Sequence, residues 1–442
     1  MLRCSAAPLQ EPSVSQRIDL TAKRTSPQIM DGLRALARTK AISHGSFQES
    51  QIGARYFSMI RVFAYPTQDP TYERGDVPEE GVSEPLGHPQ EAAQYANARL
   101  NLVIIPRDDT ETIKMSRNNF LRLYDSFNID PSTLDHICQN WYGFDFSGTM
   151  YNGACTFFIG TVLYTLAFSF NPATTETSAI LLPRDSNGFS TGLEATREFE
   201  TILRSYIDKL RSPTTLILVA LVHLEQWLDM SIYRQLRDIR RAEHKSGYGP
   251  YGMRSKRVEI DTLTRLSIEI GTTLVTLSNT VRHQEIAKSL VEFLDESAKP
   301  DAKNSFAPAR IKEVCDASFL PAIDHLKRQL KGGALSTKYL QERTQSQSDV
   351  IFALLTHEDA KISIDQGESM KTIAVVTMVF LPGTFLATLW AVPSLQWDQT
   401  PVIKSNFWVY WVFALPFTAF VLVIWHIFTR QKRYLTLCSS FL

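Results

Sequence analysis

Acidic and histidine side chains that can bind a cation lie together between residues 357 and 368. His357, Glu358 and Asp359 are consecutive, and Asp365 and Glu368 follow. Carboxylate oxygens are the ligands that hard divalent cations such as Mg²⁺ prefer. Asp365 and Glu368, with the HED run, are therefore candidates for a divalent-cation site between stalk helices. A solvated helix face is the alternative, and the sequence leaves both open.

Sequence motifs give little support for catalysis. The sequence contains no HExxH and no Walker A loop, and its five cysteines are scattered without a CxxC pair. GFSTG at 188–192 matches GxSxG in its letters, but no catalytic constellation can be assembled. "GYGPYG" at 247–252 fits GxGxxG only formally, because it follows a charged helical segment instead of a strand. The formal net charge is zero, which argues against a nucleic-acid partner. We expect a protein that is not an enzyme.

The hydrophobic pattern predicts the elements that position these residues. "TVLYTLAFSF" at 161–170 alternates in the manner of a strand, and 100–106 and 178–183 look like companion strands. Helical patterns follow at 213–243, 258–294, 309–330 and, after Gly332-Gly333, from 335 onward. We predict a cytosolic α/β domain over 96–330 and a stalk helix over 331–371. Residues 1–95, with a Pro-, Ser-, Gly- and Glu-rich tract at 65–90, are predicted to be largely disordered.

Three stretches carry no Asp, Glu, Lys or Arg: 146–175, 372–397 and 405–429. The alternation of side chains at 161–170 predicts that the first stretch belongs to a β-sheet. The other two predict transmembrane helices over 372–392 and 407–428, since at about 1.5 Å per residue each crosses a hydrocarbon core of roughly 30 Å. An outer loop, 393–406, joins them, and a basic tail, 429–442, follows.

Basic residues predict the orientation in the lipid bilayer. Lys371 precedes the first span, and Arg430, Lys432 and Arg433 form a basic inner ring after the second. By the positive-inside tendency both termini face inward. The predicted fold class is a mostly helical membrane protein, in which an α+β cytosolic domain is followed by a long stalk helix and two C-terminal transmembrane helices.

The first span and the segments after it resemble the CorA-type magnesium channels. The resemblance rests on Met370-Lys371, Phe380, Pro382, Thr384-Phe385 and Ala387, followed by a short loop, a second span and a basic tail. It is specific over roughly residues 335–435, and "KTIAVVTMVFLPGTF" most resembles a eukaryotic branch called CorA-like. The resemblance implies a homopentamer whose first spans surround a pore for magnesium-type divalent cations. It implies no cofactor other than a transported or regulatory cation, and we favour the plasma membrane over the mitochondrial inner membrane or the vacuole.

The end of the first span departs from the family. Its members have Gly-Met-Asn there, and the corresponding residues are Ala391, Val392 and Pro393. Mg²⁺ keeps its hydration waters, so a selectivity site holds it through oxygen acceptors, which these side chains lack. One predicted function is a divalent-cation channel with a degenerate selectivity motif. The other is a non-conducting, membrane-anchored signalling or scaffold protein that retains the fold.

Steps of three and four residues along the first span define a candidate pore face. It consists of Met370, Ile373, Thr377, Leu381, Thr384 and Thr388. Threonine hydroxyls can bind the waters of a hydrated ion, and apolar rings can gate a pore by dewetting. Small hydroxyl residues also pack helix against helix, and this alternative stays open.

Overall fold

A computed structural model describes most of the chain. The described residues are 27–48, 55–82, 96–108, 111–184, 191–250, 258–298, 317–394 and 408–439. They divide into two compact units. The first unit contains a β-sheet and the helices up to Gln347. The second contains the residues from Ser348 onward, with a short segment around residue 260.

A seven-stranded sheet forms the centre of the first unit, in the order β2-β1-β3-β7-β6-β5-β4. The strands are β1 (Tyr56–Ala64), β2 (Thr71–Pro78), β3 (Ala98–Ile104), β4 (Gly143–Phe146), β5 (Cys155–Gly160), β6 (Tyr164–Asn171) and β7 (Glu176–Pro183). Only the β3–β7 pair is parallel among these strands, with Leu102 opposite Ala179, and the other pairs are antiparallel.

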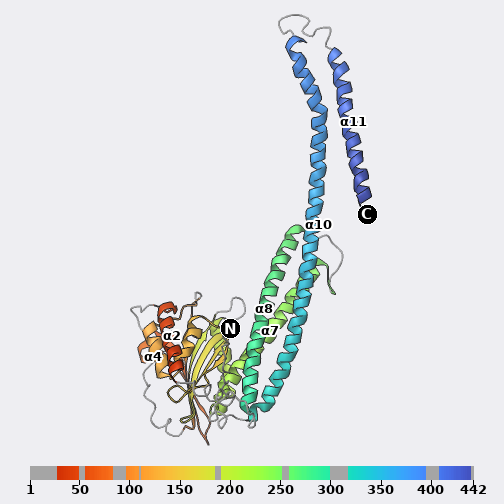
Figure 1. Ribbon diagram of the computed structural model, residues 1–442. Helices are drawn as coiled ribbons and strands as arrows, with labels where there is room; N and C mark the ends of the chain where they lie inside the picture. Colours follow the sequence, from red (N-terminus) through yellow and green to blue (C-terminus); the bar gives the residue numbers. More distant parts are fainter. Residues whose placement is uncertain are drawn as a thin grey trace, which may run out of the picture. The chain divides into compact units, whose positions relative to one another are not determined.

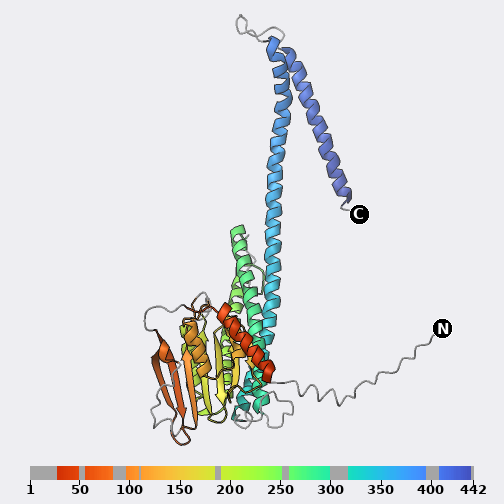
Figure 2. The ribbon, with the colours of Figure 1, turned by 60° about the vertical axis from the view of Figure 1, so that its left-hand side comes forward.

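Helices cover both faces of this sheet. The helices of the described residues are α2 (Pro27–His44), α4 (Arg117–Ser126), α5 (Leu134–Cys138), α6 (Gly192–Arg204), α7 (Thr214–Ser246), α8 (Ile260–Ala298), α10 (Leu320–Ser394) and α11 (Trp408–Ser439). Short 3-10 turns lie at Glu79–Gly81, Pro131–Thr133, Ile207–Lys209 and Ala317–Phe319. One core joins a sheet face to α2, α4 and α5, and the other joins the opposite face to α6, α7, α8 and the start of α10. Figures 1 and 2 show α7, α8 and this part of α10 running side by side.

The alternating pattern of β6 explains how one strand serves both cores. Leu166, Phe168 and Phe170 pack into the core with α6 and α7, whereas Ala167 packs into the core with α4. Both faces are buried because helices cover both. The strand predictions for 100–106, 161–170 and 178–183 are confirmed.

The prediction of disorder for 1–95 is wrong for three elements. The helix α2 and the strands β1 and β2 lie in that range, and Ile60 and Val62 of β1 are fully buried. β1 pairs with both β2 and β3, so it is an internal strand. Its neighbour β2 is mostly exposed at the edge of the sheet, where polar side chains are favoured. Part of the polar tract at 65–90 is therefore this edge strand and not a loop.

The predicted boundary at 330/331 is also wrong, because α10 begins at Leu320 and continues through Gly332 and Gly333. Two helical glycines cost about 2 kcal/mol relative to alanine. Packing against the neighbouring helices offsets this cost. Gln284 of α8 donates a 2.8 Å hydrogen bond to the Thr337 hydroxyl, and Leu340 lies in a buried cluster with residues of α7 and α8.

The C-terminal boundaries shift as well. α10 extends to Ser394, so the first residues of the predicted outer loop are helical, and 395–407 lie outside the described residues. α11 extends to Ser439, so most of the predicted basic tail has a helical backbone.

Two described helices are long and apolar enough to cross a membrane, and burial separates them. In α7 the most apolar window is 72% buried, so this helix belongs to the core, as its short apolar run predicted. In α10 the corresponding window is only 6% buried. Trp411–Ile427 of α11 is a shorter apolar stretch. The composition of α10 and α11 therefore supports membrane insertion. The apolar residues of α7 are instead buried in the core of the first unit.

Candidate functional site

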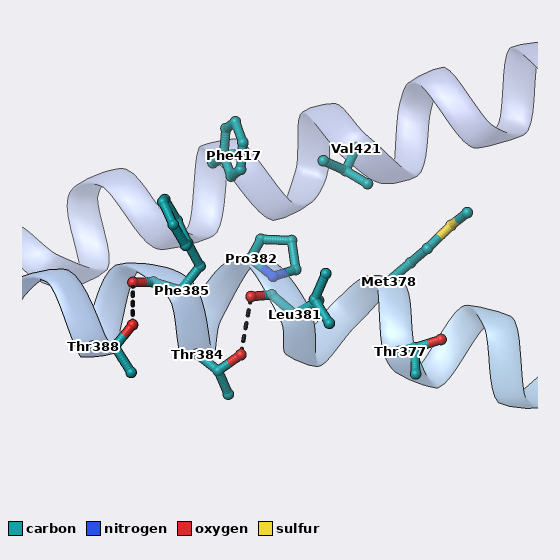
Figure 3. Close-up of a pocket in the computed structure, with 9 residues that line it drawn as sticks. All are labelled: Thr377, Met378, Leu381, Pro382, Thr384, Phe385, Thr388, Phe417 and Val421. Carbon is teal, nitrogen blue, oxygen red and sulfur yellow. Dashed lines mark hydrogen bonds between the residues drawn. The ribbon is translucent and has the colours of Figure 1, made fainter.

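The apolar part of α10 forms a groove with α11. Its volume is about 610 Å³. Pro382 is buried there, and Figure 3 shows Pro382 and Phe385 pointing toward α11, where Phe417 and Val421 lie opposite. Proline has no N–H to donate to the carbonyl of Met378, one turn earlier. We call this feature the α10–α11 groove.

The candidate pore face lies along one side of α10. Its six residues fall within a narrow arc of the helix and extend over about 27 Å of axis. Figure 3 shows Thr384 and Thr388 on the side of α10 away from α11. The side chains of Met370, Ile373 and Leu381 are 71%, 64% and 69% exposed. The structure therefore places all six predicted residues on one exposed side of α10, although Thr377, Leu381, Thr384 and Thr388 also line the α10–α11 groove.

The threonine hydroxyls on this face donate their hydrogens to the backbone of their own helix. Thr377 donates to the carbonyl of Ile373 at 2.8 Å, Thr384 to that of Leu381 at 3.0 Å, and Thr388 to that of Phe385 at 2.8 Å. Each hydroxyl oxygen keeps lone pairs that can accept hydrogen bonds. In this arrangement the oxygens act as acceptors toward whatever lies along the face.

Two other sets of predicted residues lie on the backbones of described helices. Ala391, Val392 and Pro393 are in the last turn of α10, and Arg430, Lys432 and Arg433 are in α11. Their side chains lie outside what the structure describes.

Asp365 and Glu368, the predicted metal ligands, are both exposed on α10. No group of three or more His, Cys, Asp or Glu side chains that could hold a metal occurs among the described residues. A cation at Asp365 and Glu368 would therefore require ligands from water or from another chain.

Sequence reasoning missed the residues with which α10 meets α11. Met378, Pro382 and Phe385 follow one another at steps of four and three residues, which is a helical stripe. That spacing was visible, but it did not show which of two apolar stripes contacts α11. The contribution of Phe417 and Val421 had no separate signal in the sequence.

Comparisons with known proteins found only distant similarity to this chain. No protein-family model matches the chain. "Notoamide biosynthesis cluster protein M'" of Aspergillus versicolor is 28% identical over 88 residues, which is 19% of this chain and 19% of that protein. The match thus spans less than a fifth of the curated relative. The structure of the full-length CmaX protein covers 87% of this chain and 99% of its own, at 11% identity and a TM-score of 0.41. We base the functional argument on the described residues.

Proposed function

We propose that the protein is an integral membrane channel for hydrated divalent cations, similar to CorA in design, in which α10 lines the pore of a homo-oligomer. The observation that carries this proposal is the candidate pore face, a continuous exposed row of threonine and apolar residues along α10, part of which also lines the α10–α11 groove. An apolar helix surface of this extent needs lipid or a partner chain to cover it. The oxygens of the threonine hydroxyls in this row can still accept hydrogen bonds, which water or a polar group of another helix can donate and lipid tails cannot.

The chemistry of the face fits a hydrated cation. Mg²⁺ dehydrates reluctantly, so a pore holds it through acceptors for the hydrogens of its bound waters. Thr377, Thr384 and Thr388 supply such acceptors, because their own hydrogens are already donated to the backbone. Rings of Leu381 and Met370 would form the apolar constrictions at which a pore can close by dewetting.

The same proposal includes the orientation and the regulation of the channel. Lys371 and the cluster Arg430, Lys432 and Arg433 would lie on the inner side of the bilayer, by the positive-inside tendency. Asp365 and Glu368 precede the span on this side, where carboxylates from neighbouring chains could share a regulatory cation. We propose the plasma membrane as the location.

A second candidate function is a non-conducting membrane anchor for signalling or scaffolding. It is favoured by Ala391, Val392 and Pro393 at the end of the first span, where side-chain oxygens are missing. In that case the candidate pore face would be a packing surface between helices.

Ion flux distinguishes the two functions. The full chain is reconstituted into liposomes that contain a magnesium-sensitive dye, together with the variants Leu381→Ser and Val379→Ser. Val379 is the matched control, because it lies on the opposite side of α10 and is also exposed. The channel proposal predicts that Leu381→Ser raises cation leak about tenfold or more, while Val379→Ser leaves it unchanged. Equal flux through both variants and empty liposomes would support the anchor.

A further inference from the structure

A crevice lies at the carboxyl ends of the two parallel strands, far along the chain from the proposed pore. After β3 the chain continues to α4, which packs on one face of the sheet, and after β7 it continues to α6, which packs on the other. Neighbouring parallel strands whose connections leave on opposite faces open a crevice between them, and such positions are common ligand sites in α/β sheets. The fold alone does not identify the ligand, so the class of ligand is inferred from the side chains that line the crevice.

The crevice is a pocket of about 470 Å³ with cationic and apolar walls. Arg74, Arg107 and Lys114 line it, and no carboxylate is among its described lining residues. Lys114 makes no ion pair within the described part of the chain, while Arg74 pairs with Glu200 at 2.9 Å. Phe57 and Leu193 are among the apolar lining residues. The pocket therefore combines positive charge with a surface for an organic group.

Arg107 is the most constrained of these cations. The residue is 7% exposed, and its Nη2 donates a 3.0 Å hydrogen bond to the carbonyl of Ile137. Its Nη1 donates to Asn140 and, at 3.4 Å, to Glu111. These contacts fix the guanidinium at the end of α5. The Nε is buried and has no acceptor among the described residues.

Arg184 directly follows β7 and, like Arg107, is buried with N–H donors that have no acceptor among the described residues. It is 3% exposed, and its Nη2 donates a 2.7 Å hydrogen bond to the Thr165 hydroxyl. Its Nε and Nη1 are buried without an acceptor among the described residues. The guanidinium also stacks over Tyr142 at 4.2 Å. Two neighbouring strand ends thus each carry a buried arginine with unused donors.

The positive charge at these strand ends is only partly neutralised. Glu111 is the one carboxylate that contacts Arg107 among the described residues, and its side chain is 48% exposed. Burial, with the nearby charge of Arg184, lowers the pKa of Arg107 to about 10. A buried charge without full compensation is costly, and buried unpaired donors call for a partner. An anion bound in the pocket would supply negative charge beside both arginines and an acceptor for the Nε of Arg107, which lines the pocket, whereas Arg184 is not among the described lining residues.

We propose that this crevice binds an organic phosphate, with the phosphate held by Lys114, Arg74 and Arg107 and the organic part against Phe57 and Leu193. Phosphate oxygens match several converging cationic donors better than a single carboxylate does. The α6 N-terminus at Gly192 also lies in the pocket wall, but its own capping box of Thr191 and Glu194 already occupies it, so the cationic side chains carry the proposal. The site is independent of the proposed pore, so binding and ion flux can fail separately.

Titration calorimetry on the full chain in detergent tests the site with phenyl phosphate, inorganic phosphate and phenol. Phenyl phosphate should bind more tightly than inorganic phosphate, and phenol should not bind detectably. Lys114→Ala should weaken phenyl phosphate binding about tenfold, the equivalent of one charge-assisted hydrogen bond. Arg122→Ala is the matched control, since it removes an exposed positive charge of α4 outside the pocket and should leave binding unchanged.

Arg107→Gln probes the buried cation and should abolish binding. Because this variant can unfold, circular dichroism accompanies it, and Lys114→Ala alone decides the outcome if Arg107→Gln does not fold. The proposal is overturned if neither phosphate compound binds at millimolar concentration. It is also overturned if Lys114→Ala and Arg122→Ala bind phenyl phosphate equally well.

Discussion

The carboxylate of Glu243 on α7 receives two hydrogen bonds from the guanidinium of Arg343 on α10. Arg343 Nε lies 2.5 Å from Oε1, and Nη2 lies 2.6 Å from Oε2. The Glu243 side chain is 1% exposed and that of Arg343 is 12% exposed. This bidentate pair helps to fix the register between two helices that also share the buried apolar cluster of Ile239, Leu277 and Leu340. A slip of α10 by one turn would break this pair and separate the buried Glu243 carboxylate from Arg343.

Removing Arg343 should therefore destabilise the first unit strongly. Arg343→Met should lower the free energy of unfolding by about 3 to 5 kcal/mol, the usual cost of leaving one partner of a buried pair alone. Denaturant unfolding followed by circular dichroism measures this loss. The double variant Glu243→Gln with Arg343→Met should recover most of it, because no charge then remains buried. A double variant as unstable as Arg343→Met would contradict this account.

His283 of α8 should make the first unit sensitive to acid. Its Nε2 accepts a 2.9 Å hydrogen bond from the Val162 amide, and its Nδ1 donates to the carbonyl of Asn279 at 2.8 Å, so the ring is neutral. Burial lowers the pKa of His283 from 6.5 to about 4. Between these values the unfolded chain binds a proton that the folded chain does not, and stability falls as the pH falls. The loss should reach about 3 kcal/mol by pH 4.

Unfolding measured at several pH values checks this slope. His283→Gln should be less stable at pH 7.5, because the longer amide does not reproduce both hydrogen bonds, and its stability should depend less on pH from 6.5 to 4. His244, in the last turn of α7, offers a control: His244→Gln should keep the acid slope. An unchanged slope in His283→Gln would assign the acid sensitivity to other groups.

The sheet shows which parts of the fold a sequence can predict. β6 was recognisable because both faces are buried and its residues alternate in size and polarity. β2 was not, because at the edge of the sheet Glu73, Arg74 and Asp76 are exposed, and such a strand resembles a loop in composition. The helix through Gly332-Gly333 was missed for the opposite reason, since contacts such as Gln284 to Thr337 override the local preference.

The candidate site was predictable to a similar degree. Helical spacing placed Thr377, Thr384 and Thr388 on one face, and the structure places them together. Which face meets α11 depends on packing across two segments, and the spacing does not contain that information. The buried Arg107 and Arg184 were missed because they are about 80 residues apart in sequence and meet only through the parallel pairing of β3 and β7.

Two spans should cross the bilayer with both termini on one side. The support is compositional: charge-free stretches in α10 and α11, and basic residues flanking each on the same predicted side. Cleavable tags at the two termini of the protein in sealed vesicles should show the same protection from added protease. A tag at residue 398, between the spans, should show the opposite protection. Opposite protection of the two terminal tags would contradict the topology.

A pore lined by the candidate pore face would need that face from several chains, so the proposed function predicts a homo-oligomer. The resemblance to CorA-type channels gives five copies as the expected number. Native mass spectrometry in detergent should detect a pentamer. Thr384→Trp should shift it to smaller species, because a bulky side chain on this face prevents close approach of the helices. Val379→Trp, on the opposite side of α10, should leave the oligomer intact. A monomer of the unaltered chain would exclude a shared pore.

Conduction of magnesium should be limited by the end of α10. Ala391, Val392 and Pro393 provide no side-chain oxygen for the waters around Mg²⁺ at the position where CorA-type channels have asparagine. The triple variant Ala391→Gly, Val392→Met, Pro393→Asn should therefore raise magnesium uptake into liposomes about tenfold or more, equivalent to at least 1.4 kcal/mol of improved recognition. Sodium uptake, measured in parallel, should rise much less.

Leu381→Ser supplies the contrast that separates recognition from gating. Widening the apolar ring at Leu381 should raise magnesium and sodium leak together, since dewetting blocks all hydrated ions alike. Selectivity should improve only when the asparagine is introduced, because only then does an amide oxygen meet the hydration shell. If the unaltered protein already carries magnesium as fast as the triple variant, the missing asparagine is not what limits transport. Threonine hydroxyls of the candidate pore face would then have to provide the recognition, and Thr388→Val should abolish it.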